Sequence, residues 1–356
     1  MKNIVFLILP IAILSLLIGI YAGLIRIGWQ LPLWSGIKIS THGVIMAGSF
    51  LGSLICLERV VTLKSKWLML LPIVMVASMP ALLFQYSVLA YQLLISGSLG
   101  YAIISLKIAL KQKLTGDYLL FIGALFQICA NVVLYKTNSY PMAFACWMLF
   151  LIFTIVGERL NLTRFLPVTR SDKNELIAWL VILAASSGFY HFGSAIMVGI
   201  SFIGLAQWLL RNDIALLNSR KTGSYKFLGF SLIGAYLWLL ITGLISFQKQ
   251  GNPFLYDALL HSFLIGFAFS MIMAHAPIIF PGILKINVKP YHSILFVWLG
   301  LLHFSLLLRI AGDFIQNGLL RKTGGLLNGI SFIAYLATIV YLIIKQKQPQ
   351  QYGQSY

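Results

Sequence analysis

The chain has 356 residues, of which 60% are hydrophobic and 10% charged, and its mean hydropathy is +0.91. Soluble domains are about 45–50% apolar and about 25% charged, so this composition excludes a soluble globular enzyme. Lys and Arg number 26 against 8 Asp and Glu, a formal net charge of +18. These cations lie in short gaps between apolar runs, which indicates a multi-pass membrane protein and not a nucleic-acid-binding protein.

Twelve apolar segments approach the length of about 20 residues that a membrane-spanning helix needs. In chain order they are predicted near residues 4–24, 40–57, 67–84, 87–106, 117–134, 141–157, 175–190, 194–210, 227–247, 256–280, 293–311 and 325–344. No gap between them is long enough for a soluble domain. The sequence therefore predicts an all-α bundle of about 12 transmembrane helices in one integral membrane domain, residues 1–356. The first segment lacks a small-residue cleavage site and is interpreted as an uncleaved helix.

The distribution of Lys and Arg predicts the orientation of these helices. The two termini and the even-numbered gaps carry 19 of these residues, and the remaining positions carry 7. Because basic loops stay on the cytoplasmic side of a membrane, we expect both termini in the cytoplasm. The basic excess then orients the protein in a cell inner membrane, with the lipid bilayer as a partner.

Two Glu-Arg pairs indicate an internal repeat. Glu58-Arg59 ends the second predicted span, and Glu158-Arg159 ends the sixth, 100 residues later. Repeats build many large membrane folds. Three four-helix blocks would account for the spacing, over residues 1–110, 111–215 and 216–345. Alternatively, both arginines are ordinary cytoplasmic anchors and each Glu is a local partner. Adjacent residues of a helix do not face each other, so a pair such as Glu58 with Arg159 would join two helices.

The six histidines are the main candidates for chemistry, because ionisable groups at membrane depth are rare and mark functional sites. His42 lies about one turn below the outer surface on span 2, and His261 lies at a matching depth on span 10. Asp257 precedes His261 by four residues on the same helix face and could accept the Nδ1 proton of its ring. Two imidazoles from different helices can bind the two faces of a haem iron. Alternatively, both rings only form hydrogen bonds to neighbouring helices or interfacial water.

The remaining histidines are weaker candidates for a metal site. His191 closes span 7 at the outer side, so three histidines gather near one face of the membrane. His275 lies 14 residues after His261, ahead of Pro277, which should kink span 10. His303 lies near the midplane of span 11, where it could bind a second metal, relay protons or tie two helices together. We favour the tie.

No other type of site is predicted. Cys56, Cys129 and Cys146 are scattered through apolar runs without CxxC spacing, and they support neither a disulfide framework nor a zinc module. The sequence also has no phosphate-binding loop and no Ser-His-Asp set placed for nucleophilic catalysis. Whether the chain is an enzyme is therefore left open.

Two stretches resemble NnrS-type membrane proteins. The first runs from His42-Gly-Val-Ile-Met to Leu57-Glu-Arg59, and the second runs from Leu260-His-Ser-Phe to His275-Ala-Pro277. The resemblance implies a twelve-helix protein that binds haem b, is associated with copper and takes part in the response to nitric oxide. This chain has His42 alone where those proteins have a His-x-His pattern.

More distantly, the layout resembles the catalytic subunit of haem–copper oxidases. That subunit has twelve helices in three blocks and a low-spin haem held by histidines of helices 2 and 10, which His42 and His261 match. Span 6 has no histidine and span 7 has no His-His pair. The resemblance therefore does not extend to the oxidase copper site, and oxygen reduction by that mechanism is not expected.

These observations together predict a haem-binding inner-membrane protein of NnrS type, with His42 and His261 as axial ligands and Asp257 supporting His261. It would act in the nitric oxide response or in membrane electron transfer, with nitric oxide or a redox partner. The alternative is a proton-coupled secondary transporter with a site around spans 10 and 11. A third interpretation is an assembly subunit, and neither alternative would contain a chromophore.

Overall fold

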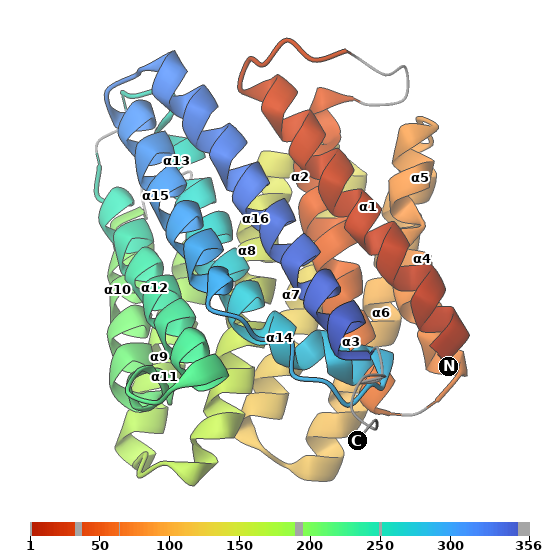
Figure 1. Ribbon diagram of the computed structural model, residues 1–356, viewed down its shortest axis with the longest axis vertical. Coiled ribbons are helices and arrows are strands. Elements are labelled where there is room, and N and C mark those ends of the chain that lie inside the picture. The colour runs from red at the N-terminus through yellow and green to blue at the C-terminus, as the bar shows by residue number, and fades with distance from the viewer. Residues whose placement is uncertain (1, 33–37, 64, 189–194, 249–250, 348–356) are drawn as a thin grey trace, which may run out of the picture. The chain divides into compact units, whose positions relative to one another are not determined.

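The computed structural model describes residues 2–32, 38–63, 65–188, 195–248 and 251–347 (Figure 1). Within these residues every regular element is a helix, and ten helices are long and apolar enough to cross a membrane. The chain is therefore an all-α, multi-pass membrane protein, as its apolar runs predict. Its internal contacts divide it into two compact units, Met1–Lys173 with Ala184–Ser194 and Asn174–Leu183 with Ala195–Tyr356.

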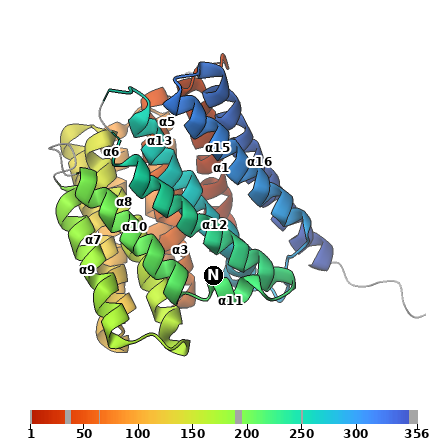
Figure 2. The ribbon, with the colours of Figure 1, turned by 90° about the vertical axis from the view of Figure 1, so that its left-hand side faces the viewer.

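The first unit is built from long helices joined by short turns. Its α-helices are α1 (Lys2–Arg26), α2 (His42–Val44), α3 (Ser53–Thr62), α4 (Leu70–Val76), α5 (Ser78–Leu83), α6 (Ser87–Gln112), α7 (Thr115–Thr137) and α8 (Tyr140–Leu162). Single 3₁₀ turns lie at η1 (Ile39–Thr41), η3 (Trp67–Met69) and η4 (Thr163–Phe165). α7 packs against both α6 and α8, and the three helices are labelled in Figure 2.

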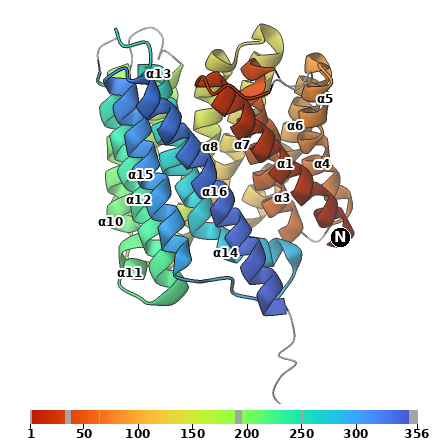
Figure 3. The same cartoon turned by 45° about the horizontal axis from the view of Figure 1, so that its top comes forward.

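The second unit has the same construction. Its α-helices are α10 (Ala195–Asn212), α11 (Ala215–Ser219), α12 (Gly223–Ile245), α13 (Leu255–His261), α14 (Ser270–Leu284), α15 (Ile294–Phe314) and α16 (Gly318–Lys347). α15 and α16 lie side by side, and α10 packs against α12 (Figure 3). Asn317 caps the N-terminus of α16, because its Oδ1 accepts hydrogen bonds from the backbone N–H groups of Leu319 and Leu320.

Two predicted spans differ from the other ten. The third is a shorter apolar helix, Trp67–Leu83, which is interrupted at Ala77. Pro80 explains the interruption, because it has no N–H to donate to the carbonyl four residues earlier. The seventh is α9 (Arg170–Ser187), which has residues in both units and carries four charged side chains in its first two turns. These charges lower its hydropathy below that of the other spans.

Two spans change from α-helix to π-helix directly after a predicted haem ligand. In the first unit, η2 (Ile45–Gly52) begins three residues after His42, and in the second, η6 (Ser262–Phe269) follows His261 immediately. Each π-helix is eight residues long. π-Helical turns are rare and are frequent at functional sites, and each of these two begins within three residues of a predicted haem ligand.

Candidate functional site

The His261 ring is held by Asp257, one helical turn earlier in α13. Its Nδ1 lies 2.9 Å from the backbone oxygen of Asp257 and 3.3 Å from the Oδ1 of the same residue. Both oxygens are acceptors, so the neutral ring carries its proton on Nδ1 and its lone pair on Nε2. The predicted contact between Asp257 and His261 is therefore present. It leaves Nε2 as the nitrogen that is able to bind a metal.

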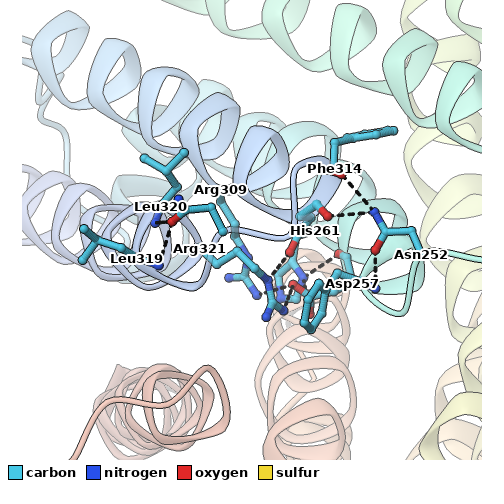
Figure 4. A network of polar contacts seen from close by, with 11 residues as sticks. Asn252, Asp257, His261, Arg309, Phe314, Leu319, Leu320 and Arg321 are labelled. Atoms are coloured by element: carbon cyan, nitrogen blue, oxygen red, sulfur yellow. Dashed lines mark hydrogen bonds and ion pairs between the residues drawn. The ribbon is translucent and has the colours of Figure 1, made fainter.

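The carboxylate of Asp257 is shared with two arginines from other helices (Figure 4). Its Oδ2 accepts a hydrogen bond from Nη2 of Arg309 in α15 at 2.9 Å and lies 3.6 Å from Nη2 of Arg321 in α16. Arg321 also pairs with Asp313, and its guanidinium lies 3.6 Å from the ring centroid of Phe254. The negative charges of two carboxylates cancel the positive charges of two guanidiniums, so the cluster is formally neutral when His261 is neutral. It fastens the first turn of α13 to α15 and α16.

Asn252 closes this cluster from the loop before α13. Its Nδ2 donates to the backbone oxygens of Asp313 and Phe314 at 2.8 and 3.3 Å, and its Oδ1 accepts from the Phe254 N–H at 2.9 Å. The last carbonyls of a helix have no partner within the helix. Asn252 therefore supplies hydrogen bonds to the carbonyl groups at the end of α15 and fixes the loop that leads into α13.

His42 has a similar arrangement in the first unit. Its Nδ1 lies 2.7 Å from the backbone oxygen of Gly19 in α1. The ring lies against Gly23, where an added Cβ would come within 2.8 Å of Cε1 of His42. A carbonyl accepts only, so the neutral His42 ring also carries its proton on Nδ1 and its lone pair on Nε2. His42 and His261 belong to different units, and their joint binding of one haem stays a prediction.

His303 ties two helices of the second unit together. Nε1 of Trp238 in α12 donates to Nδ1 of His303 in α15 at 3.0 Å. Because an indole N–H only donates, the proton of the neutral His303 ring lies on Nε2. The ring also lies against Gly234, where a Cβ would be 2.6 Å from that nitrogen. This arrangement is the polar tie that we favour, and it does not present a lone pair to a metal.

His275 and His191 are the other predicted metal candidates. Nδ1 of His275 lies 2.6 Å from the Met271 backbone oxygen, one turn earlier in its own helix. His191 lies outside the described residues. In the part of the chain that the structure describes, no group of three or more His, Cys, Asp or Glu side chains could hold a metal ion.

Pro277 interrupts the hydrogen bonding of α14, as its position predicts. It has no N–H for the carbonyl of Met273, four residues earlier. The hydroxyl of Tyr335 in α16 donates to that carbonyl at 2.6 Å. A backbone group that would be costly to leave unpaired inside a membrane is therefore satisfied by the neighbouring helix.

The two Glu-Arg pairs lie in one buried polar cluster of the first unit. Nη2 of Arg59 lies 3.7 Å from Oδ1 of Asp117, which also accepts from Nδ2 of Asn161 at 3.1 Å. Glu58 interacts electrostatically with Glu158 and with Arg159 of the other pair. Arg159 is buried, so it is not a solvated loop anchor. The two Glu-Arg pairs therefore interact across two helices, and a direct ion pair between Glu58 and Arg159 stays a prediction.

This cluster contains residues that sequence reasoning missed. Asp117 is 2% exposed, and its Oδ2 has no hydrogen-bond partner among the described residues. Further along the buried face of α7, both amide atoms of Gln127 are likewise unpaired. The signal was available, because Asp117, Gln127 and Asn131 recur on one face of a helix that is otherwise apolar. Polar groups in such a setting favour binding or moving a proton or water.

Comparison with known proteins identifies a family but not an activity. A family model described as a domain of unknown function (DUF8744) matches residues 5–344, which is nearly the whole described chain. No curated protein and no solved structure matches the chain.

Proposed function

Because the chain belongs to the DUF8744 family, described as a domain of unknown function, we propose a function from its own residues. The chain would be a haem b protein of the cell inner membrane, and His42 and His261 would be the residues that hold the haem. The observation that carries this proposal is common to both histidines. Their Nδ1 atoms lie 2.7 Å from the Gly19 oxygen and 2.9 Å from the Asp257 oxygen, which leaves the lone pair on Nε2.

The proposed role is electron transfer within the membrane. Held by His42 and His261, a haem would supply one-electron redox chemistry and would leave no site for a gas ligand. A part in the nitric oxide response then runs through a redox partner. The resemblance of residues 42–59 and 260–277 to NnrS-type proteins supports the same cofactor.

Three residues of the second unit would prepare His261 for this role. Asp257 holds the ring through Nδ1 and so keeps the orientation of Nε2. Arg309 and Arg321 hold the Asp257 carboxylate in turn, at 2.9 and 3.6 Å. This support restricts ring rotation before any ligand binds, which lowers the entropic cost of ligation.

The proposed orientation places both termini in the cytoplasm, with the two histidines towards the outer side. It is supported by the bias of 19 against 7 Lys and Arg between the two sides. Two of the seven, Arg309 and Arg321, are bound in the Asp257 cluster. They are therefore not free charges in a loop. When these two arginines are left out, the excess of Lys and Arg on the cytoplasmic side is larger.

The test is the haem content of the purified protein. We expect full-length protein from haem-replete cells to show a Soret band, and a reduced-minus-oxidised spectrum with the sharp α-band of low-spin haem. His42→Ala and His261→Ala should each lose haem or become high-spin. His292→Ala, which changes an exposed histidine in the loop before α15, should keep the wild-type spectrum.

Two results would contradict the proposal. One is wild-type protein without a Soret band. The other is a spectrum that neither His42→Ala nor His261→Ala alters. Substrate uptake that depends on pH, in a preparation without a chromophore, would favour the transporter alternative instead.

A further inference from the structure

Cys129 and Cys146 are brought together by the packing of α7 against α8. Their Sγ atoms lie 3.2 Å apart, and both residues are free thiols. The S–S bond of a disulfide is about 2.05 Å long. The two sulfurs therefore need to approach each other by only about 1.2 Å to form a bond, which a change of side-chain torsion can supply.

Both cysteines lie at one depth in the apolar part of the hairpin. Cys129 is eight residues before the end of α7 at Thr137, and Cys146 is six residues after the start of α8 at Tyr140. At 1.5 Å per residue, they lie about 12 Å and about 9 Å from the ends that the connecting turn joins. This depth is well inside a hydrocarbon core about 30 Å thick.

The surface around the pair is apolar and open. Cys129 is exposed and Cys146 is half-buried. Leu125 and Val132, on the Cys129 face of α7, are 44% and 38% exposed, and Met142, one turn before Cys146, is 56% exposed. Exposed apolar side chains inside a membrane-spanning helix face lipid. A reagent that reaches the pair must therefore dissolve in the membrane.

We propose that Cys129 and Cys146 form a redox-active dithiol, which a membrane-soluble quinone oxidises to a disulfide between α7 and α8. The two thiols lose two electrons and two protons as the S–S bond forms. The quinone accepts both electrons and both protons and becomes a quinol. A quinone fits because it partitions into lipid and because its two-electron, two-proton exchange equals that of a dithiol.

This site is independent of the haem proposal, since it uses no histidine and no metal. Cys56 takes no part, because it is buried in the first unit at 0% exposure. Reduced, the dithiol leaves α7 and α8 joined only by their turn and their packing. Oxidised, it adds a covalent link between the two helices.

The test counts thiols that become protected by oxidation. Membranes containing the full chain are treated with a short-chain benzoquinone and dissolved in SDS with N-ethylmaleimide, which blocks every free thiol, including Cys56. After reduction, maleimide-polyethylene glycol is added. We expect two additions per chain in the wild type and in Cys56→Ala. We expect none in Cys129→Ser, in Cys146→Ser or in wild type that received no quinone.

Several outcomes would overturn the proposal. One is the absence of labelling that depends on the quinone, and another is equal labelling of Cys129→Ser and wild type. A third is a disulfide-linked dimer on a non-reducing gel. A water-soluble oxidant that acts as fast as the quinone at equal concentration would contradict the lipid-facing assignment. If a serine variant fails to fold, mass spectrometry of wild-type peptides identifies directly whether Cys129 is linked to Cys146.

Discussion

Replacing Asp257 with Ala removes the one carboxylate that His261, Arg309 and Arg321 share. The side chain of Arg309 is only 8% exposed and that of Asp257 is 22% exposed. Removing one partner of a buried ion pair costs about 3–5 kcal/mol, because the other charge stays buried without compensation. Since Asp257 is partly open to solvent, we expect Asp257→Ala to lower the free energy of unfolding by about 2–4 kcal/mol.

The second unit contains a matched control for this prediction. Arg211 and Glu175 form an ion pair of 2.7 Å, but their side chains are 58% and 37% exposed. Exposed pairs contribute about 0–1 kcal/mol, so Arg211→Ala should change stability by no more than that.

The assay is SDS-induced unfolding in detergent micelles, followed by the helical circular dichroism signal. Adding Arg309→Met to Asp257→Ala should recover part of the loss, because an apolar side chain then replaces the uncompensated charge. Equal losses in Asp257→Ala and Arg211→Ala, or no recovery in the double variant, would show that burial does not set the contribution of these ion pairs.

Three further predictions concern two local contacts and the orientation of the helices in the membrane. Tyr335→Phe leaves the Met273 carbonyl without its donor and should cost about 1–3 kcal/mol in the same SDS assay; an unchanged midpoint would contradict it. Gly23→Val places a side chain against the His42 ring, where a Cβ alone would come within 2.8 Å. It should lower haem content per chain, measured by pyridine haemochrome, whereas wild-type haem content would argue against ligation by His42. A phosphatase reporter should be active between α7 and α8 and inactive between α8 and α9; the reverse would contradict cytoplasmic termini.

Local features of the fold could be predicted from the sequence because they depend on neighbouring residues alone. The apolar runs locate the helices, since a membrane requires about 20 apolar residues in a row. Contact between Asp257 and His261 follows from a spacing of four on one helix. The effect of Pro277 is equally local, although the identity of its compensating partner, Tyr335, is not.

Features that depend on packing between helices could not be predicted in this way. Arg309 and Arg321 are 52 and 64 residues from Asp257 in sequence, and only the packing of α15 and α16 brings them to it. The Cys129–Cys146 contact likewise needs the register of α7 on α8. The π-helical turns after His42 and His261 have no separate sequence signal, because Gly, Ser and Phe in these segments are compatible with an ordinary α-helix.

Electron paramagnetic resonance of the oxidised, full-length protein would show whether His42 and His261 each bind haem iron through Nε2. We expect a low-spin ferric signal typical of two imidazole ligands, which His261→Ala converts to high spin and His292→Ala leaves unchanged. A haem signal that is high-spin in the wild type, or a purified protein with no ferric haem signal, would contradict it.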